Sequence, residues 1–206
     1  MGQLTDSGPG TTEVQDADWY GEDLSGREHT AVRFSGVDLT EATGEGAVFT
    51  DCTFVDCRFT ATRFTDAAFL NCSFTGCSFF QAELTACKFV GSRSQRCTFD
   101  LMSVDSGDWS FVLLPGADLA RATLAGARMR EADLTGVRAA GATLRGLDLS
   151  AAELSGIDFA GADLRGSDLS ALDPRDAELA GAQIDVTQAV VLVTTLGMRV
   201  GPDAPG

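Results

Sequence analysis

The sequence is poor in the residues that most catalytic and nucleic-acid-binding sites need. Its 206 residues include one histidine and one tyrosine, and 15 basic residues stand against 30 acidic ones, for a formal net charge of −15. A chain this negative is repelled by nucleic acid and by anionic membranes, so we expect direct binding to neither. The single histidine, His29, allows no serine–histidine or cysteine–histidine pair to be argued. A structural role for His29, as a cap or a hydrogen-bonded core residue, is favoured.

Long apolar runs and common cofactor motifs are also missing. No apolar run approaches the roughly 18 residues that span a bilayer, and no signal peptide opens the chain, so we expect a soluble, cytoplasmic protein. P-loop, G-x-G-x-x-G and H-E-x-x-H motifs are absent. The cysteines are at least five residues apart, unlike the closely spaced pairs of metal sites. We therefore expect no metal, no cofactor and no enzymatic activity.

What the sequence does have is a repeat of five residues. Stepping by five from Leu24 to Ile184 gives 33 positions, and 28 of them are Leu, Phe, Ile, Met, Val or Trp. We call this position i; residue i−2 is nearly always small, and glycine is frequent at i+2. A period of five fits neither an α-helix nor a flat strand, so the backbone must turn once per repeat. The pattern predicts a solenoid in which i and i−2 point inward and i−1, i+1 and i+2 face water.

The six cysteines share one phase of this repeat. All of them occupy position i−2, where other repeats carry alanine: Cys52, Cys57, Cys72, Cys77, Cys87 and Cys97. A free cysteine behaves as a small buried hydrophobic residue. We expect all six thiols to be reduced and buried in the core.

The pattern A-(D/N)-L-x-x, seen at 117–119, 132–134 and 162–164, resembles the pentapeptide repeat family. That resemblance implies an all-β fold, a right-handed quadrilateral β-helix with four repeats, or twenty residues, per coil and about eight coils. With twenty residues per coil, aromatic side chains would stack in two columns. One column would hold Phe49, Phe69, Phe89 and Trp109, and the other Phe59, Phe79 and Phe99.

The chain divides into four segments. Residues 1–18 are expected to form a flexible acidic tail, 19–185 the repeat, 186–197 a helix and 198–206 a second tail. Asp185 as N-cap and Gly197 after the end delimit the helix. We expect it to cover the open end of the solenoid and to join two copies; a monomeric cap is the alternative. The expected dimer interface comprises Val186, Ala189, Val190, Leu192, Val193 and Leu196.

The repeat is least regular between residues 92 and 116. Ser94 occupies a core position, while Phe111 and Leu113 fall on positions that should point outward. An exposed apolar spot here could bind a partner. A local distortion that buries these side chains is the alternative.

The i−1 position becomes acidic toward the end of the repeat. Seven residues in succession form what we call the acidic ridge: Asp148, Glu153, Asp158, Asp163, Asp168, Asp173 and Glu178. Because i−1 faces water, these carboxylates should wind around the last coils. Aspartate can accept hydrogen bonds from its own turn, which is the structural interpretation. The functional interpretation is an anionic surface that imitates a nucleic-acid backbone.

A narrower resemblance supports the functional interpretation. Residues 22–29, 49–54 and 181–190 are similar to the mycobacterial fluoroquinolone-resistance members of the family. The resemblance implies a dimeric rod that mimics B-form DNA, binds DNA gyrase and alters its response to quinolones or other gyrase poisons. The alternative is a structural scaffold with a different protein partner, because the repeat itself does not encode a function.

Overall fold

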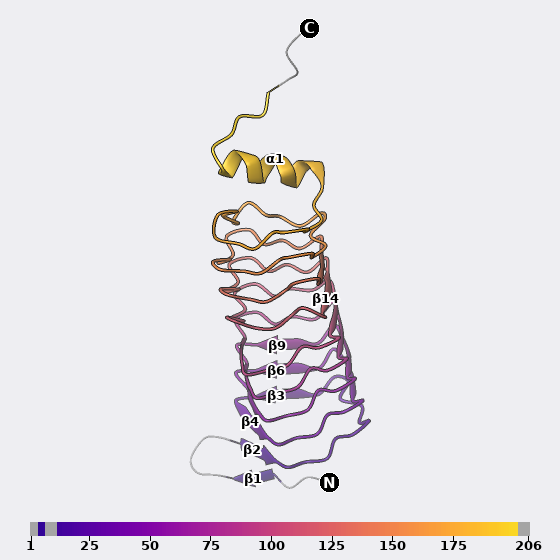
Figure 1. Ribbon diagram of the computed structural model, residues 1–206. Helices are drawn as coiled ribbons and strands as arrows, with labels where there is room; N and C mark the ends of the chain where they lie inside the picture. Colours follow the sequence, from indigo (N-terminus) through magenta and orange to yellow (C-terminus); the bar gives the residue numbers. More distant parts are fainter. Residues whose placement is uncertain (1–3, 7–11, 202–206) are drawn as a thin grey trace.

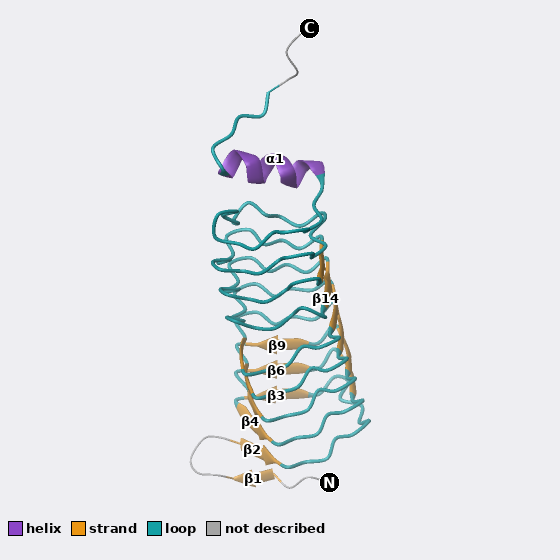
Figure 2. Ribbon diagram, viewed as in Figure 1, coloured by secondary structure: helices purple, strands orange, loops and turns teal. Residues whose placement is uncertain are grey.

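The computed structural model describes residues 4–6 and 12–201, which form a rod with its long axis along the stack of coils (Figure 1). Short strands line the rod and a single helix lies across its C-terminal end (Figure 2). The elements are β1 Leu4–Asp6, β2 Thr12–Gln15, β3 Glu28–Thr30, β4 Val32–Ser35, β5 Thr43–Glu45, β6 Val48–Thr50, β7 Thr53–Val55, β8 Arg63–Thr65, β9 Ala68–Leu70, β10 Ser73–Thr75, β11 Glu83–Thr85, β12 Arg93–Gln95, β13 Ser103–Asp105, β14 Thr123–Ala125, β15 Thr143–Arg145 and α1 Val186–Thr195.

Strand pairing fixes the coil at twenty residues. Ser73 of β10 pairs in parallel with Thr53 of β7 on one side and with Arg93 of β12 on the other. The same offset recurs on four sides of the rod. Side 1 contains β2, β4, β7, β10 and β12; side 2 is formed by two runs of single bridges, from Asp18 to Thr98 and from Asp118 to Glu178; side 3 runs from β5 to β15; side 4 begins with β3, β6 and β9. The quadrilateral β-helix predicted from the sequence is confirmed.

The corners explain the residues at i+2. Among the described residues, sixteen other than glycine have a positive φ, and every one of them lies at i+2 of its repeat. Glycine adopts this left-handed region freely, and Asp and Asn tolerate it, whereas bulky side chains rarely do. Leu101, with φ 58°, and Phe111, with φ 59°, are the large apolar exceptions. Their place at a corner holds their side chains outside the core.

The core is a ladder of stacked side chains, as predicted. Ring centroids are 4.9 Å apart for Phe49 and Phe69, 4.7 Å for Phe69 and Phe89, and 4.2 Å for Phe89 and Trp109. The column of Phe59, Phe79 and Phe99 is also present. Aromatic stacks of this kind contribute about 0.5–1.5 kcal/mol per pair beyond the buried area.

His29 and Cys97 depart from their predicted surroundings. The ring of His29 extends the first aromatic column, 5.2 Å from Phe49, but its buried Nε2 has no hydrogen-bond partner within the described chain. The role of His29 is therefore structural, as predicted, but not that of a hydrogen-bonded residue. All six cysteines are free; five are buried, whereas Cys97 is only half-buried and lies within the irregular stretch.

The N-terminal boundary also differs from the prediction. Residues 12–18 are not a tail: β2 pairs with β4, and Val14 and Ala17 are buried at the first coil. β1 adds an antiparallel strand to β2, so the edge of side 1 is covered. The sequence signal was present, because Val14 and Trp19 continue the five-residue phase below Leu24. Residues 1–3 and 7–11 of the predicted tail lie outside the described residues.

Candidate protein-binding surfaces

The acidic ridge does not form one surface. Because a coil has four sides, successive i−1 residues lie on successive sides, so that Asp158 and Glu178 bridge on side 2 while Asp163 lies on side 3. Asp148 and Asp168 belong to side 4, and Glu153 and Asp173 to side 1, by the same twenty-residue offset. The predicted winding is thus present, but at most two of these carboxylates share a side.

The local role of these carboxylates is to close their own turns. In six of the seven residues a carboxylate oxygen accepts a hydrogen bond from the backbone N–H two residues later: Asp148, Glu153, Asp158, Asp163, Asp168 and Asp173. The distance is 2.9 Å from Ala160 N to Asp158 Oδ1 and 2.8 Å from Ser170 N to Asp168 Oδ1. These are Asx-type turns, which aspartate favours for this reason. The structural interpretation therefore holds for most of the ridge.

Arginines neutralise part of the ridge. Asp163 binds Arg165 at 2.7 Å and lies 3.8 Å from Arg145, and the hydrogen bond from Arg165 is the main reason that its pKa falls to about 2. Asp173 pairs with Arg175 at 3.5 Å, and Asp148 lies 3.9 Å from Arg130. Within the described chain the other four make no ion pair, namely Glu153, Asp158, Asp168 and Glu178. The unpaired negative charge of the acidic ridge rests on these four.

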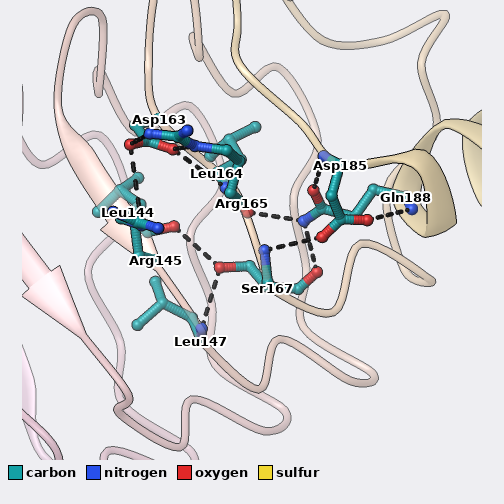
Figure 3. A network of polar contacts seen from close by, with 10 residues as sticks. Leu144, Arg145, Leu147, Asp163, Leu164, Arg165, Ser167, Asp185 and Gln188 are labelled. Atoms are coloured by element: carbon teal, nitrogen blue, oxygen red, sulfur yellow. Dashed lines mark hydrogen bonds and ion pairs between the residues drawn. The ribbon is translucent and has the colours of Figure 1, made fainter.

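The helix α1 closes the C-terminal end of the rod, and a polar network anchors it there (Figure 3). Asp185 caps the helix by accepting from Gln188 N at 3.0 Å, and Gln188 Oε1 accepts from Asp185 N at 2.8 Å. The second carboxylate oxygen of Asp185 accepts from Gly166 N at 3.1 Å in the coil below. The helix begins after Asp185, as predicted, but it ends at Thr195, two residues before the predicted end at residue 197.

Gln188 holds the helix against the C-terminal end of the rod, a role that the sequence analysis did not predict. Its amide Nε2 donates to the carbonyls of Leu164, at 2.6 Å, and Ser167, at 2.7 Å. Ser167 in turn donates from Oγ to Leu144 O and accepts from Leu147 N, which links three successive levels of the rod (Figure 3). The signal was available, because Asp185 followed three residues later by Gln188 is a capping-box pattern.

The predicted dimer-interface residues fall into two groups. Val186 is 82% exposed, Val190 39% and Leu196 38%, so these three present apolar surface at the end of the rod. Ala189 and Val193 are half-buried. Leu192 is buried against the core of its own chain and was wrongly assigned to a dimer interface, because it lies on the opposite face of the helix from Val190. The surface available to a second copy is therefore smaller than predicted.

The described residues contain neither a cluster of side chains able to hold a metal ion nor a helix long enough to cross a bilayer. The outer surface of the rod consists of turns, charged ladders and one apolar end. Such a solenoid belongs to the class of elongated repeat proteins that act through their surfaces.

Comparison with known proteins places the chain within that class. Residues 114–150 and 142–179 match the model of pentapeptide repeats, and residues 24–99 match the model of the SV2A/B/C luminal domain. Residues 114–179 therefore carry pentapeptide repeats, and the β-helix of the rod is consistent with the fold that such repeats form. None of the curated proteins matches it.

Two solved structures illustrate the likeness of fold. HetL, a pentapeptide repeat protein involved in heterocyst differentiation regulation from the cyanobacterium Nostoc sp. strain PCC 7120, is 20% identical, with 83% of this chain and 84% of HetL covered and a TM-score of 0.58. A trypsin-treated form of QnrB1, a plasmid-mediated fluoroquinolone resistance protein, is 20% identical, with 93% of this chain and 100% of that chain covered and a TM-score of 0.50. At this identity the likeness concerns the fold alone.

Proposed function

We propose that this protein is a non-enzymatic, cytoplasmic DNA mimic that binds DNA gyrase as a homodimer and changes the response of gyrase to quinolones or other gyrase poisons. The observation that carries the proposal is the combination of a net charge of −15 with four carboxylates of the acidic ridge that no arginine neutralises. The similarity of residues 22–29, 49–54 and 181–190 to the mycobacterial fluoroquinolone-resistance protein MfpA supports it.

The homodimer in this proposal uses the helix end. Val186 and Val190 lie one helical turn apart on the outer face of α1, and Val186 lies between Val190 and Val193 around the helix axis. Joining two such faces would remove apolar surface from water and would align two rods end to end. Such a dimer carries a formal net charge of twice −15, or −30.

The proposal is tested by purified gyrase in supercoiling and drug-dependent cleavage assays, with and without this protein. Addition of the protein should inhibit supercoiling or reduce drug-stabilised cleavage. The charge requirement is tested by replacing Asp158 and Asp168 with Asn and Glu153 and Glu178 with Gln, because amides keep the capacity to accept the turn hydrogen bonds. Gyrase binding should weaken, and its dependence on salt should flatten, since fewer charges meet the basic DNA-binding surface.

A matched control is Asp163→Asn, whose charge is already neutralised by Arg165. This substitution removes a carboxylate that is already paired, so the loss of gyrase affinity per charge removed should be smaller than in the fourfold variant. Unchanged gyrase affinity and salt slope in the fourfold variant, with native melting, would contradict mimicry. That outcome would favour the second candidate, a scaffold for a different protein partner, which the turn-closing role of six ridge carboxylates supports.

A further inference from the structure

Positive charge without a partner is concentrated on one coil in the middle of the rod. Eleven arginines each form an ion pair, which leaves 15 − 11, or four, of the basic residues. Those four are Lys88, Arg93, Arg96 and Arg199, and within the described chain none of them makes an ion pair. Three of them thus fall within nine residues of a chain in which acids outnumber bases two to one.

Exposed apolar side chains adjoin these cations. Leu113 is 39% exposed and pairs in register with Arg93, so the two side chains are neighbours on side 1. Phe111 is 49% exposed and occupies the corner that leads into the same side. The equivalent corner one coil earlier is Gly91, which places no side chain below the Phe111 ring. The structure therefore favours the exposed alternative for the irregular stretch, not a distortion that buries these residues.

A cleft opens at the corner where side 1 meets side 2. Ser94, paired with Phe74 in β10, occupies the core position of its repeat beside this cleft, and the bridges of side 2 are interrupted between Thr98 and Asp118. The cleft has a volume of about 200 Å³, and its lining includes Ser94, Arg96, Cys97, Phe99, Pro115, Asp118 and Arg138. Cys97, Phe99 and Pro115 supply apolar surface beside the unpaired guanidinium of Arg96, and Asp118 and Arg138 in the same lining pair with each other. Apolar surface next to an unpaired guanidinium is suited to a ligand with an apolar anchor beside a carboxylate.

We propose that Arg93, Arg96, Phe111 and Leu113, which we call the Arg93 patch, form a docking site for an acidic protein segment that carries large apolar side chains. The carboxylates would pair with Arg93 and Arg96, while an apolar side chain would enter the cleft beside Pro115 and another would pack on Phe111. Neither part suffices alone, because exposed ion pairs contribute only about 0–1 kcal/mol each. Nucleic acid is disfavoured, since the chain as a whole repels a polyanion and the patch offers only two or three cations. This site is opposite in charge to the acidic ridge and independent of gyrase binding.

The test uses the full chain and three fluorescein-labelled probes in anisotropy titrations. The first probe is a peptide in which glutamate alternates with leucine and phenylalanine, the second is polyglutamate of the same length, and the third is a single-stranded oligonucleotide. The first should bind at least about tenfold more tightly than the others. Absence of measurable binding by the first probe, or equal binding of all three, would overturn the proposal.

Substitutions with residues from the same columns keep the fold testable. Phe111→Asn copies Asn71, which has φ 52° at the equivalent corner, and Leu113→Thr copies Thr53. Arg93→Ser and Arg96→Gly copy Ser73 and Gly76. The double variant Phe111→Asn with Leu113→Thr and the double variant Arg93→Ser with Arg96→Gly should each bind the first probe at least about tenfold more weakly. Both variants should melt at the temperature of the natural chain.

The matched control changes a second exposed apolar pair that no unpaired cation adjoins. Phe80 is 36% exposed and Leu101 39%, and Phe80→Thr with Leu101→Gln copies Thr60 and Gln81 of the same columns. This control should bind the first probe as the natural chain does. Equal loss in the control and in the Arg93 patch variants would show nonspecific adsorption and would also overturn the proposal.

Discussion

Gln188 in the C-terminal helix donates a hydrogen bond of 2.6 Å to the backbone carbonyl of Leu164, twenty-four residues earlier. A solenoid ends with carbonyls that have no following coil to bond to, and here a buried side-chain amide takes the place of that coil. The helix is therefore joined to the rod by directional bonds as well as by apolar contact.

Replacing Gln188 with Leu should detach the helix. The change leaves the carbonyl of Ser167 buried without its donor, at a cost of about 1–3 kcal/mol, and leaves the carbonyl of Leu164 with only the hydrogen bond from Ser167 N. Amide hydrogen exchange should accelerate in residues 164–195 and stay unchanged near β6. Thr187→Ala, at an exposed neighbouring position, serves as the control and should leave exchange as it is.

Val190→Glu should convert the proposed dimer into a monomer while leaving the melting temperature of each chain nearly unchanged. A carboxylate at this exposed position costs little in the single rod but is buried without a partner between two helices. Light scattering gives the mass. Thr135→Glu, on the flank of the rod, should stay dimeric. If Val190→Glu is also dimeric, the two copies meet elsewhere.

Leu192→Glu tests the same helix from its other face. Because Leu192 packs on the core of its own chain, a charge there should destabilise the cap irrespective of oligomeric state. Accelerated exchange in residues 186–195, even in dilute solution where only monomers exist, is the expected result. If the oligomeric mass changes while amide hydrogen exchange stays native, Leu192 lies in the dimer interface after all.

His29 should make stability fall below about pH 6.5. Burial is the main cause that lowers the pKa of His29 from 6.5, with Arg27 contributing. As pH falls through 6.5, His29 binds a proton in the unfolded chain but not yet in the folded chain, so the free energy of unfolding decreases. Urea unfolding at about pH 7.5 and about pH 5.5 measures the loss, and His29→Phe should reduce it. If the natural chain and His29→Phe lose the same free energy of unfolding between the two pH values, groups other than His29 cause the loss.

Cys97 should be the first thiol to react. It is half-buried, and a hydrogen bond from Cys77 lowers its pKa, whereas burial raises the pKa of Cys87 to about 11. A thiol reagent without denaturant should therefore label one cysteine per chain rapidly, and Cys97→Ala should remove that fast phase. Rapid labelling of several thiols would contradict the stacked core.

The repeat made most of this fold predictable. The five-residue phase from Leu24 to Ile184 assigns inward and outward positions, and each column of the core follows from the twenty-residue coil that the family resemblance supplied. The aromatic columns through Phe49 and Phe59 are confirmed for this reason.

The residues that the sequence placed wrongly depend on tertiary surroundings. The rotation of α1 on the rod decides that Leu192 is buried and Val190 exposed, and composition alone does not encode it. Likewise, the division of the acidic ridge among four sides follows from the coil, but the neutralisation of Asp163 depends on where the Arg165 side chain lies. The pairing of residues 12–18 was missed because their polar composition outweighed the phase of Val14 and Trp19.

The twenty-residue offset has a consequence for how such a rod can change length in evolution. Duplication of one whole coil would lengthen the molecule and leave every surface beyond it pointing in the same direction. Duplication of a single pentapeptide would instead turn everything beyond it by a quarter of a revolution, moving the Arg93 patch relative to the acidic ridge. Duplication of a whole coil thus changes the length of the rod alone, whereas duplication of one pentapeptide also changes the direction in which the later surfaces face.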